Sequence, residues 1–424
     1  MSGVKLPKNK KMSITKKLYI YNKPKKVYIP LISSNDENIT VLVKKDDYVF
    51  KGSVVGRRKG TYKMPIHSSV SGKVIGFEEH TYLNGEKVKC IVIENDFKEK
   101  MEHRITPRTS INKFTKEEFL DNLLNHGVIG QGGGGFPTYA KFKTDKKINT
   151  LIVNAVECEP YITADFMLFK EKCEEILEAI DAIVEINNID EAIIATKKSN
   201  VTLNKLLENF LGTYLKIKLV NVPNLYPMGW ERTLIKDVKD VTYDRLPIEK
   251  GIVVVNASTV FSIYEALKLD KPVIERVVTF TGEMLKEPQN VLVKIGTPVS
   301  EVIENIGGYK RNKEIVFVAG GPMMGIALPT DDLVVSPNMN CVLVLKNIEP
   351  PTRTECMRCG KCVQVCPAKL CPVLIRDSLN NIDDLDSYNA DRCVECGLCS
   401  YICPAKINIR QFVKIGKKKL NERG

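Results

Sequence analysis

The chain contains CMRCGKCVQVCP at residues 356–367 and repeats the spacing of its cysteines in CVECGLCSYICP at residues 393–404. Each run has three cysteines two residues apart, then a fourth cysteine followed by proline. Three thiolates at this spacing can wrap one cubane cluster, and in two-cluster ferredoxins the fourth cysteine of each run binds the other cluster. The sequence therefore predicts two [4Fe–4S] clusters. One is assigned to Cys356, Cys359, Cys362 and Cys403, and the other to Cys393, Cys396, Cys399 and Cys366.

Structural zinc is the alternative for these cysteines, because zinc sites also use pairs of cysteines two residues apart. Four cysteines in each run, duplicated with proline at the same place, fit a zinc site poorly. In a long chain without a secretory signal, clustered cysteines indicate metal binding rather than disulfides. Five cysteines lie outside the two runs: Cys90, Cys158, Cys173, Cys341 and Cys371.

The composition is that of a folded globular protein: 43% of the 424 residues are hydrophobic and 27% are charged. This length favours several domains. No apolar run reaches the ~20 residues that a transmembrane helix needs, and the N-terminus lacks the apolar core of a secretory signal. We expect a cytoplasmic protein with no transmembrane segment, whose membrane association, if any, would be peripheral.

The net charge of +12 is concentrated at the two ends of the sequence. Residues 1–26 form a basic arm with nine lysines and no acidic residue, and residues 405–424 have seven basic residues and one acidic residue. The middle of the chain is slightly acidic, whereas a nucleic-acid-binding protein carries its basic residues on a folded face. We therefore expect no nucleic-acid partner. Solvated, mobile ends are the simplest interpretation, and docking to an acidic partner or an anionic membrane surface is the alternative.

Residues 27–110 show short predicted strands at 27–32, 39–45, 68–77 and 89–95, with turn residues between them. The segments DDYVFKGSVVG (46–56) and PIHSSVSGKVIG (65–76) resemble the barrel-sandwich hybrid of lipoyl and biotinyl carrier domains. Lys59 and Lys63 lie where such carriers have their modified lysine, but neither stands in a carrier motif. We expect a structural barrel here rather than a swinging arm.

Strands alternate with helices over residues 111–270, which predicts a parallel or mixed α/β sheet covered by helices. The expected helices span 115–127, 165–187 and 201–214, with a short one near 230, and the expected strands span 151–156, 192–196, 216–222 and 252–257. Residues 271–347 predict a small β-rich domain with one helix. Residues 348–424 hold a proline-containing linker, the cysteine runs and the basic tail. The predicted fold class is multidomain, α/β and α+β.

A glycine-rich loop, GVIGQGGGGFPT, occupies residues 127–138 after a predicted helix. Glycines let backbone N–H groups approach a phosphate closely, and Lys141 would add a positive charge. The loop is neither a Walker A motif nor a dinucleotide fingerprint. A flexible loop is the alternative interpretation.

The segment LIVNAVECEPYITAD (151–165) places polar residues at and after the carboxyl end of a predicted strand. Ligands of α/β sheets bind at this end of the strands. The residues are Asn154, Glu157, Glu159 and Asp165, and Glu159 is suited to binding ribose hydroxyls. Alternatively, these acids cap the following helix and remain solvated.

The glycine loop and the ECEP segment together resemble the RnfC family, the C subunit of the Rnf NAD–ferredoxin oxidoreductase, which is related to the NADH- and FMN-binding subunit of respiratory complex I. Further segments resemble the family's own versions: YPMGWERTLI (226–235), VVVNASTV (253–260), TFTGEM (279–284) and AGGPMMG (319–325). The resemblance covers most of residues 27–410. It implies a barrel-sandwich hybrid (27–110), an FMN/NADH-binding α/β domain (111–270), an SLBB (β-grasp-like) domain (271–347) and a two-cluster ferredoxin-like helical domain (348–424).

The resemblance implies FMN and NADH as cofactors beside the two clusters. It assigns FMN to the glycine loop, Lys141, Asn154, Asn256 and Thr259, and the nicotinamide nucleotide to Phe136 and Glu159, with Glu231 at the edge of the site. The loop positions are Gly130, Gly132, Gly133, Gly134 and Gly135. Hydride transfer between NADH and FMN needs no side-chain acid or base, so no catalytic residue is predicted.

Two features depart from the family pattern. Trp230 stands where a small residue is common, and the lysine-rich arm replaces an N-terminal GGxHP-type signature. We expect an NADH-oxidising electron-transfer protein that passes electrons to a partner reductase or a ferredoxin-type protein. D-proline reductase is the candidate partner, because one branch of the family is associated with it. The alternatives are the peripheral C subunit of a membrane Rnf complex and an iron–sulfur wiring subunit without flavin activity.

Overall fold

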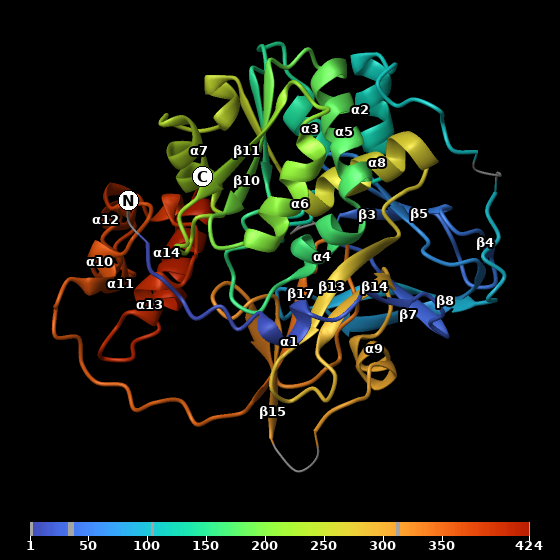
Figure 1. Ribbon diagram of the computed structural model, residues 1–424. Helices are drawn as coiled ribbons and strands as arrows, with labels where there is room; N and C mark the ends of the chain where they lie inside the picture. The colour runs from blue at the N-terminus through green and yellow to red at the C-terminus, as the bar shows by residue number, and fades with distance from the viewer. Residues whose placement is uncertain (1–2, 33–37, 103–105, 311–313, 424) are drawn as a thin grey trace.

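The computed structural model describes residues 3–32, 38–102, 106–310 and 314–423. The predicted multidomain α/β and α+β fold is confirmed (Figure 1). A β-sandwich barrel, a parallel α/β unit, a β-grasp-like unit and a helical cysteine-rich unit follow one another along the chain.

The barrel unit consists of two small antiparallel sheets that enclose one apolar core. Alternate residues of one strand, Val27 and Ile29, are fully buried in this core with Ile91 and Ile93 of its neighbour, as the period of two along a β-strand requires. The sheet orders are β2-β8-β7-β4 and β3-β5-β6. The strands are β2 (Lys26–Pro30), β3 (Ile39–Val41), β4 (Tyr48–Val49), β5 (Val54–Arg58), β6 (Pro65–His67), β7 (Gly72–Thr81) and β8 (Lys87–Asn95).

The α/β unit has a four-stranded parallel sheet in the order β11-β10-β9-β12. Strands β9, β10 and β12 consist mainly of buried apolar residues, as expected for a sheet covered by helices, whereas the edge strand β11 exposes Lys218 and Asn221. The strands are β9 (Thr150–Asn154), β10 (Glu191–Lys197), β11 (Ile217–Val222) and β12 (Ile252–Asn256). The helices are α2 (Lys116–Asn125), α3 (Thr138–Phe142), α4 (Ala164–Glu171), α5 (Cys173–Ile186), α6 (Val201–Leu211), α7 (Glu231–Lys239), the 3₁₀ helix η1 (Pro247–Lys250) and α8 (Ala257–Leu269).

The expectation of one helix over 165–187 is wrong, because the chain breaks at Lys172 into α4 and α5. Lys172 has φ −138° and ψ 38°, outside the helical region. Helix α4 buries the four consecutive residues 166–169, whereas α5 buries one apolar stripe that includes Ile176 and Ile180. The change of direction lets α4 pack against β13 while α5 packs on α8.

The β-grasp-like unit is built on a six-stranded mixed sheet in the order β1-β14-β13-β17-β15-β16. One edge strand, β1 (Tyr19–Tyr21), comes from the N-terminal arm and pairs in parallel with β14. The other elements are β13 (Glu275–Thr281), β14 (Gln289–Lys294), α9 (Val299–Asn305), β15 (Ile315–Ala319), β16 (Ile326–Leu328) and β17 (Cys341–Lys346).

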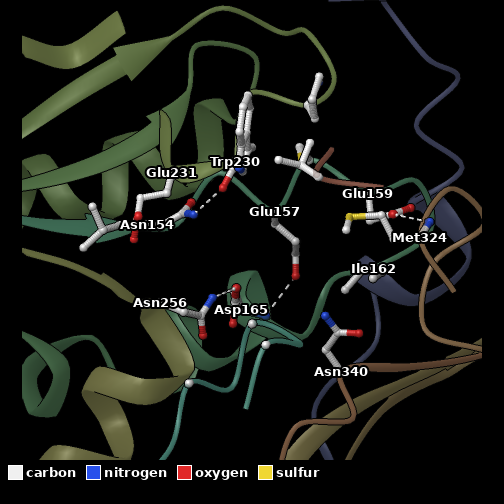
Figure 2. A pocket seen from close by; sticks show the side chains of 18 of the residues that line it. Asn154, Glu157, Glu159, Ile162, Asp165, Trp230, Glu231, Asn256, Met324 and Asn340 are labelled. Atoms are coloured by element: carbon white, nitrogen blue, oxygen red, sulfur yellow. Dashed lines mark hydrogen bonds between the residues drawn. The ribbon is translucent and has the colours of Figure 1, made fainter. Parts of the chain in front are cut away.

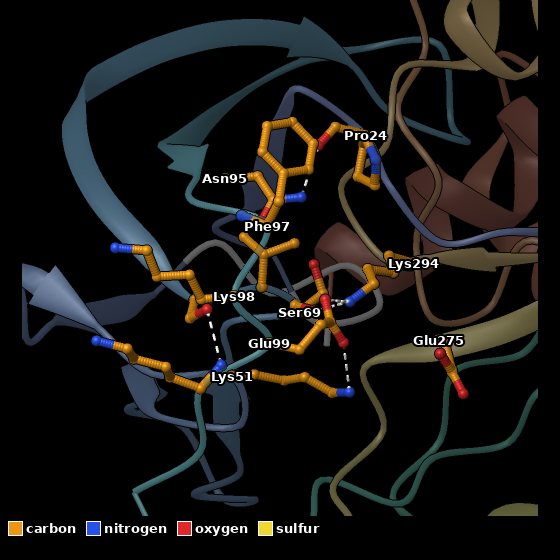
Figure 3. Close-up of polar contacts among 12 residues, drawn as sticks. Pro24, Lys51, Ser69, Asn95, Phe97, Lys98, Glu99, Glu275 and Lys294 are labelled. Carbon is orange, nitrogen blue, oxygen red and sulfur yellow. Dashed lines mark hydrogen bonds and ion pairs between the residues drawn. The ribbon is translucent and has the colours of Figure 1, made fainter.

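An ion cluster around the buried Lys294 joins the barrel to the β-grasp-like unit (Figure 3). The Lys294 side chain is 2% exposed; its ammonium contacts the Glu99 carboxylate and donates to the Ser69 carbonyl at 3.3 Å. Lys51 binds the other oxygen of Glu99 at 2.7 Å. Burial lowers the pKa of Lys294, and the carboxylate offsets part of the cost of burying the charge.

The expectation of mobile ends is wrong for the described residues of both basic segments, which are folded, whereas the expectation that their lysines are solvated holds for most of them. The arm forms α1 (Lys11–Ile14) and β1, and it exchanges two backbone hydrogen bonds between Val4 and Tyr226. The basic tail forms the C-terminal helix α14 (Ile409–Arg423), which buries Ile409 and Val413. Lysine-rich segments stay ordered here because apolar residues lie between the lysines and pack on neighbouring units.

The cysteine-rich unit packs beside the α/β unit, reached by the linker after β17 (Figure 1). Its short helices surround one apolar core to which most of the motif cysteines belong. The elements are α10 (Lys361–Gln364), α11 (Pro372–Asp377), α12 (Ile382–Ser387), the 3₁₀ helix η2 (Ala390–Arg392), α13 (Leu398–Tyr401) and α14.

Candidate functional site

A cavity of about 400 Å³ opens at the carboxyl ends of β9 and β12 (Figure 2). Paired Asn154 and Asn256 end these two strands and line it together. Three predicted site residues, Gly133, Gly135 and Thr259, do not line it. The predicted residues that do are Gly130, Gly132, Gly134, Phe136, Lys141, Asn154, Glu159, Glu231 and Asn256.

The glycine loop forms one wall of the cavity. A Cβ atom at Gly134 would meet nothing within 4 Å, and one at Gly132 would lie 3.3 Å from the Asn256 side chain. Gly133 has φ +108°, a conformation that favours glycine. Thr259 lies behind the loop, where its hydroxyl accepts a hydrogen bond from the Gln131 N–H at 2.9 Å. The open backbone of this loop fits a phosphate-bearing cofactor such as FMN.

The two asparagines at the strand ends are fixed by hydrogen bonds. The amide of Asn154 donates to the Gly229 carbonyl at 2.8 Å. The amide of Asn256 donates to the Asp165 carboxylate at 2.7 Å, and its oxygen caps α8 by accepting from the Ser258 N–H at 3.0 Å. The α8 N-terminus, with its partial positive charge, therefore lies at the cavity.

Glu231 and Trp230 stand on the same side of the cavity as Asn154 (Figure 2), and Lys141 also lines the cavity. The Lys141 ammonium donates to the Val254 carbonyl at 2.8 Å and lies 3.7 Å from the Glu231 carboxylate. Glu231 also accepts from the Tyr243 hydroxyl at 3.0 Å. Trp230 lines the wall, so the departure from the family pattern shapes the cavity directly.

Glu157 and Glu159 flank a bend that closes the opposite side. Glu157 has φ +43°, and Tyr161 has φ +68°, which non-glycine residues seldom adopt. Burial raises the pKa of each glutamate to about 7. Glu159 accepts from the backbone N–H groups of Met323 (3.1 Å) and Met324 (2.9 Å). The structure thus uses Glu159 to hold the AGGPMMG segment, and its role with a nucleotide stays a prediction.

The N-terminal arm holds Glu157 from outside the cavity. The Lys10 ammonium donates to the Glu157 carbonyl at 2.8 Å and to its carboxylate at 3.0 Å, and both side chains are largely buried. The second carboxylate oxygen accepts from the Asp165 N–H at 2.9 Å. The Tyr161 N–H donates to the Lys8 carbonyl at 2.9 Å. The arm is therefore part of the site's support.

A second, smaller cavity of about 20 Å³ lies in the cysteine-rich unit next to the first one. Four of its lining residues are Cys366, Cys393, Cys396 and Cys399, the set assigned from the sequence to one cluster. Cys396 lines both cavities. Burial raises the pKa of Cys396 to about 11 and that of Cys399 to about 12. A bound metal cluster would lower both pKa values, because it binds the deprotonated thiolates.

The other cysteine set reaches the surface at one of its four members. Cys362 and Cys403 are buried in the core of the unit, Cys356 is half-buried, and Cys359 is exposed. Among the described residues, no three Cys, His, Asp or Glu side chains are arranged to hold one metal ion. A cubane does not need such a group, since each thiolate binds a different iron.

Three contacts seat the cysteine-rich unit on the cavity wall. The buried Tyr226 hydroxyl donates to the Cys396 carbonyl at 2.7 Å. The Arg410 guanidinium donates to the carbonyls of Met323 (3.3 Å) and Met324 (2.8 Å). A Cβ atom at Gly397 would lie 2.6 Å from the Met323 carbonyl oxygen, so the two backbones are in direct contact.

The sequence did not single out several residues that build the cavity. Asn340 and Ile162 line it, and Met324 closes it beside Glu159. Ile162 belongs to the segment LIVNAVECEPYITAD and Met324 to AGGPMMG, so the sequence pointed to their segments but not to these two residues. Asn340 comes from the loop before β17, and a single asparagine in a loop gives no signal in one sequence.

Comparison with known protein families agrees with this architecture. The chain matches the RnfC barrel sandwich hybrid domain over residues 1–98, the Nuo51 FMN-binding domain over 124–265, the SLBB domain over 277–327 and the 4Fe–4S dicluster domain over 355–407. FMN and two [4Fe–4S] clusters, predicted as cofactors, are confirmed at the level of these domains.

Curated relatives match over most of their length. The chain is 33% identical to the C subunit of the Na⁺-translocating ferredoxin:NAD⁺ oxidoreductase complex of Acetobacterium woodii, over 92% of this chain and 89% of that one. It is 32% identical to the C subunit of the proton-translocating ferredoxin:NAD⁺ oxidoreductase complex of Clostridium ljungdahlii, over 88% and 82%.

Among solved structures, a chain of an NAD⁺-reducing [NiFe]-hydrogenase in the H₂-reduced state shares the fold, with a TM-score of 0.52 and 15% identity. The match covers 75% of this chain and 63% of the hydrogenase chain. None of the helices in the described ranges has the length and apolar character that a membrane crossing requires.

Proposed function

Since the chain belongs to the RnfC family, we propose that it exchanges electrons between NAD(H) and its two iron–sulfur clusters through FMN, as the C subunit of a ferredoxin:NAD oxidoreductase complex. FMN supplies the step between a two-electron hydride donor and one-electron acceptors. The observation that carries the proposal is the position of Cys396, which lines both the FMN-sized cavity and the cysteine cavity.

The residues of this chain would bind and orient the ligands. The glycine loop would hold the phosphate of FMN, and Asn154, Asn256 and Lys141 would hold its polar edges. Phe136, which is 41% exposed and packs edge-on against Tyr62 with ring centroids 5.3 Å apart, offers a face on which a nucleotide base can stack.

We assign the outward electron path to the other cysteine set. Cys359 is exposed, Met357 is 62% exposed, and the neighbouring Arg358 and Lys361 are exposed basic residues. An apolar centre with basic residues beside it suits a ferredoxin-type partner with an acidic surface. The relatives reported above are named as ferredoxin:NAD oxidoreductase subunits, which favours the Rnf alternative over D-proline reductase as the partner system.

The decisive experiment is anaerobic purification followed by assay of bound FMN and iron and by mixing with NADH. We expect a loss of flavin absorbance, followed by bleaching of the cluster absorbance. Gly134→Val should abolish flavin binding, because its side chain would enter the cavity, and Gly212→Val, at an open position outside it, is the matched control. A wild-type protein that binds no flavin and does not respond to NADH would contradict the proposal and support a wiring subunit without flavin.

A further inference from the structure

Arg276, in β13 of the β-grasp-like unit, is a buried charge with no ion-pair partner in the part of the chain that the structure describes. It is 4% exposed. Its guanidinium donates to carbonyl oxygens only: Gln131 at 3.2 Å, Val277 at 3.3 Å, and Pro337. Burial lowers the pKa of Arg276 to about 10, against an opposing effect of the Asp165 carboxylate. A buried charge without a direct ion pair is costly, and the Asp165 carboxylate, which lines the cavity, offsets only part of this cost.

Asn338 makes a similar contact with the same loop. Its amide nitrogen donates to the Gly133 carbonyl at 3.2 Å. Its orientation is fixed, because its oxygen lies 2.9 Å from the Tyr82 hydroxyl and 3.2 Å from that of Ser336. Tyr82 belongs to the barrel, so three units meet behind the glycine loop.

These two contacts determine where the loop N–H groups point. In a planar trans peptide, the C=O and the N–H of the next residue point in opposite directions. The carbonyls of Gln131 and Gly133 point back toward Arg276 and Asn338, so the N–H groups of Gly132 and Gly134 point the other way. Gly132 and Gly134 are the loop glycines, with Gly130, that line the cavity. Neither N–H has a hydrogen-bond partner within the described ranges.

We propose that Arg276 and Asn338 are positioning residues that turn the Gly132 and Gly134 amides toward the phosphate of FMN. This inference rests on the proposed function and identifies the residues that orient the loop toward the phosphate. The two aligned N–H groups form an anion-binding nest, whereas the side chains at the start of α8, Asn256 and Ser258, already bind the Asp165 carboxylate. The guanidinium behind the loop adds positive potential in a water-poor region, and the bound phosphate in turn compensates the buried charge.

The test compares FMN with riboflavin, which lacks the phosphate, on the full-length protein with clusters intact after removal of flavin. Dissociation constants are measured anaerobically by quenching of flavin fluorescence. Arg276→Met should weaken FMN binding by about tenfold or more, as expected for the loss of charge-assisted hydrogen bonding, and leave riboflavin binding within about twofold. Arg276→Lys should retain part of the preference for FMN over riboflavin, since lysine keeps the positive charge but loses the planar set of guanidinium N–H donors.

Asn338→Leu is the second variant, and it removes one carbonyl contact without changing charge. It should reduce the ratio of FMN to riboflavin affinity by less than Arg276→Met does, and it keeps the proposal testable if Arg276→Met fails to fold. The matched control is Arg108→Met, because Arg108 also donates to a backbone carbonyl, that of Leu267 at 2.6 Å, but lies away from the cavity.

Each outcome has one meaning. A selective loss of FMN affinity supports the inference. Equal losses for FMN and riboflavin, or no change in the ratio in either variant, overturn it and assign Arg276 and Asn338 a purely structural role. A wild-type protein that binds FMN and riboflavin equally overturns the inference and leaves the proposed function standing. A wild-type protein that binds neither flavin overturns the proposed function itself.

Discussion

The two cysteine repeats have the same backbone but different surroundings. The second repeat follows the first by 37 positions, and three pairs of equivalent residues have matching positive φ angles: Arg358 (50°) and Glu395 (54°), Gly360 (73°) and Gly397 (80°), Lys369 (55°) and Lys406 (55°). Yet Gly397 lies against the Met323 backbone, whereas a Cβ atom at Gly360 would meet nothing within 4 Å. The shared cysteine spacing gives both repeats the same local conformation, whereas packing against the Met323 segment gives the second repeat different neighbours.

This difference orients the cysteine-rich unit relative to the ligand cavity. The second repeat places Cys396, 9% exposed, on the wall of the cavity, while the first leaves Cys359 at the surface. Of the two predicted cluster sites, one thus adjoins the ligand cavity, and the other reaches solvent at Cys359. The two repeats have different environments because only the second one is covered by the rest of the protein.

The largest effect should come from removing one ligand from each set. Cys396→Ser and Cys359→Ser should each lose about half of the iron, since each set binds one of two clusters. Only Cys359→Ser should retain NADH-dependent bleaching of the remaining cluster absorbance, because its intact set adjoins the cavity. Anaerobic stopped-flow absorbance measures this. Equal bleaching in the two variants would show that Cys396 does not mark the entry side.

The equivalent glycines provide a sharper comparison. Gly360→Ala should cost about 1 kcal/mol, because a side chain is forced into a left-handed backbone conformation. Gly397→Ala has this cost and also places its Cβ 2.6 Å from the Met323 carbonyl oxygen, so we expect a total of about 3 kcal/mol. Anaerobic urea denaturation gives both values. If the two variants lose the same stability, the contact with Met323 does not constrain the second repeat.

Protein stability should also depend on pH through Glu159, which holds the Met323–Met324 segment that the second repeat contacts. Its pKa is raised from 4.5 to about 7 by burial, so the folded state binds more protons than the unfolded state between these values. Stability therefore falls as pH rises through this window, by about 1–3 kcal/mol relative to Glu159→Gln. Denaturation at several pH values from 5 to 7.5 (roughly the titration range) tests the slope. Glu355 is exposed beside the first repeat, so Glu355→Gln should show the same dependence of stability on pH as the wild type. If Glu159→Gln also keeps the wild-type slope, Glu159 is not the group that causes it.

The smallest effect concerns one hydrogen bond of the docked repeat. Tyr226→Phe removes the bond to the Cys396 carbonyl at 2.7 Å and should cost about 1 kcal/mol. Tyr401 lies in the same repeat and is 49% exposed, so Tyr401→Phe should have no measurable effect. Thermal unfolding under anaerobic conditions compares them. Equal melting temperatures for the two variants would mean that the Tyr226 bond does not stabilise docking.

Local patterns accounted for much of the fold. The alternation of strands and helices predicted the α/β unit, and the cysteine spacing predicted which four cysteines surround the cavity containing Cys396. The ECEP segment and the glycine loop both reach the predicted site. These features are carried by neighbouring residues in sequence, which is why one sequence reveals them.

Contacts between distant segments were not predictable from a single sequence. Lys10 could not be matched to Glu157, 147 residues later, because any lysine of the arm has the same local pattern. Arg276 has the local pattern of an ordinary exposed arginine at the start of a strand, yet it is buried. The break at Lys172 depends on what α4 and α5 pack against, and not on a helix-breaking residue.

The pairing of β1 with β14 also bears on how the protein is made. Tyr19 pairs with Val291, which is synthesised 272 residues later. At the usual speed of translation, the arm waits on the order of 10–60 s for the strand that holds it. During that interval the arm lacks the strand with which it pairs. The edge strand β1 therefore reaches its final place only after the whole α/β unit between the two strands has been synthesised.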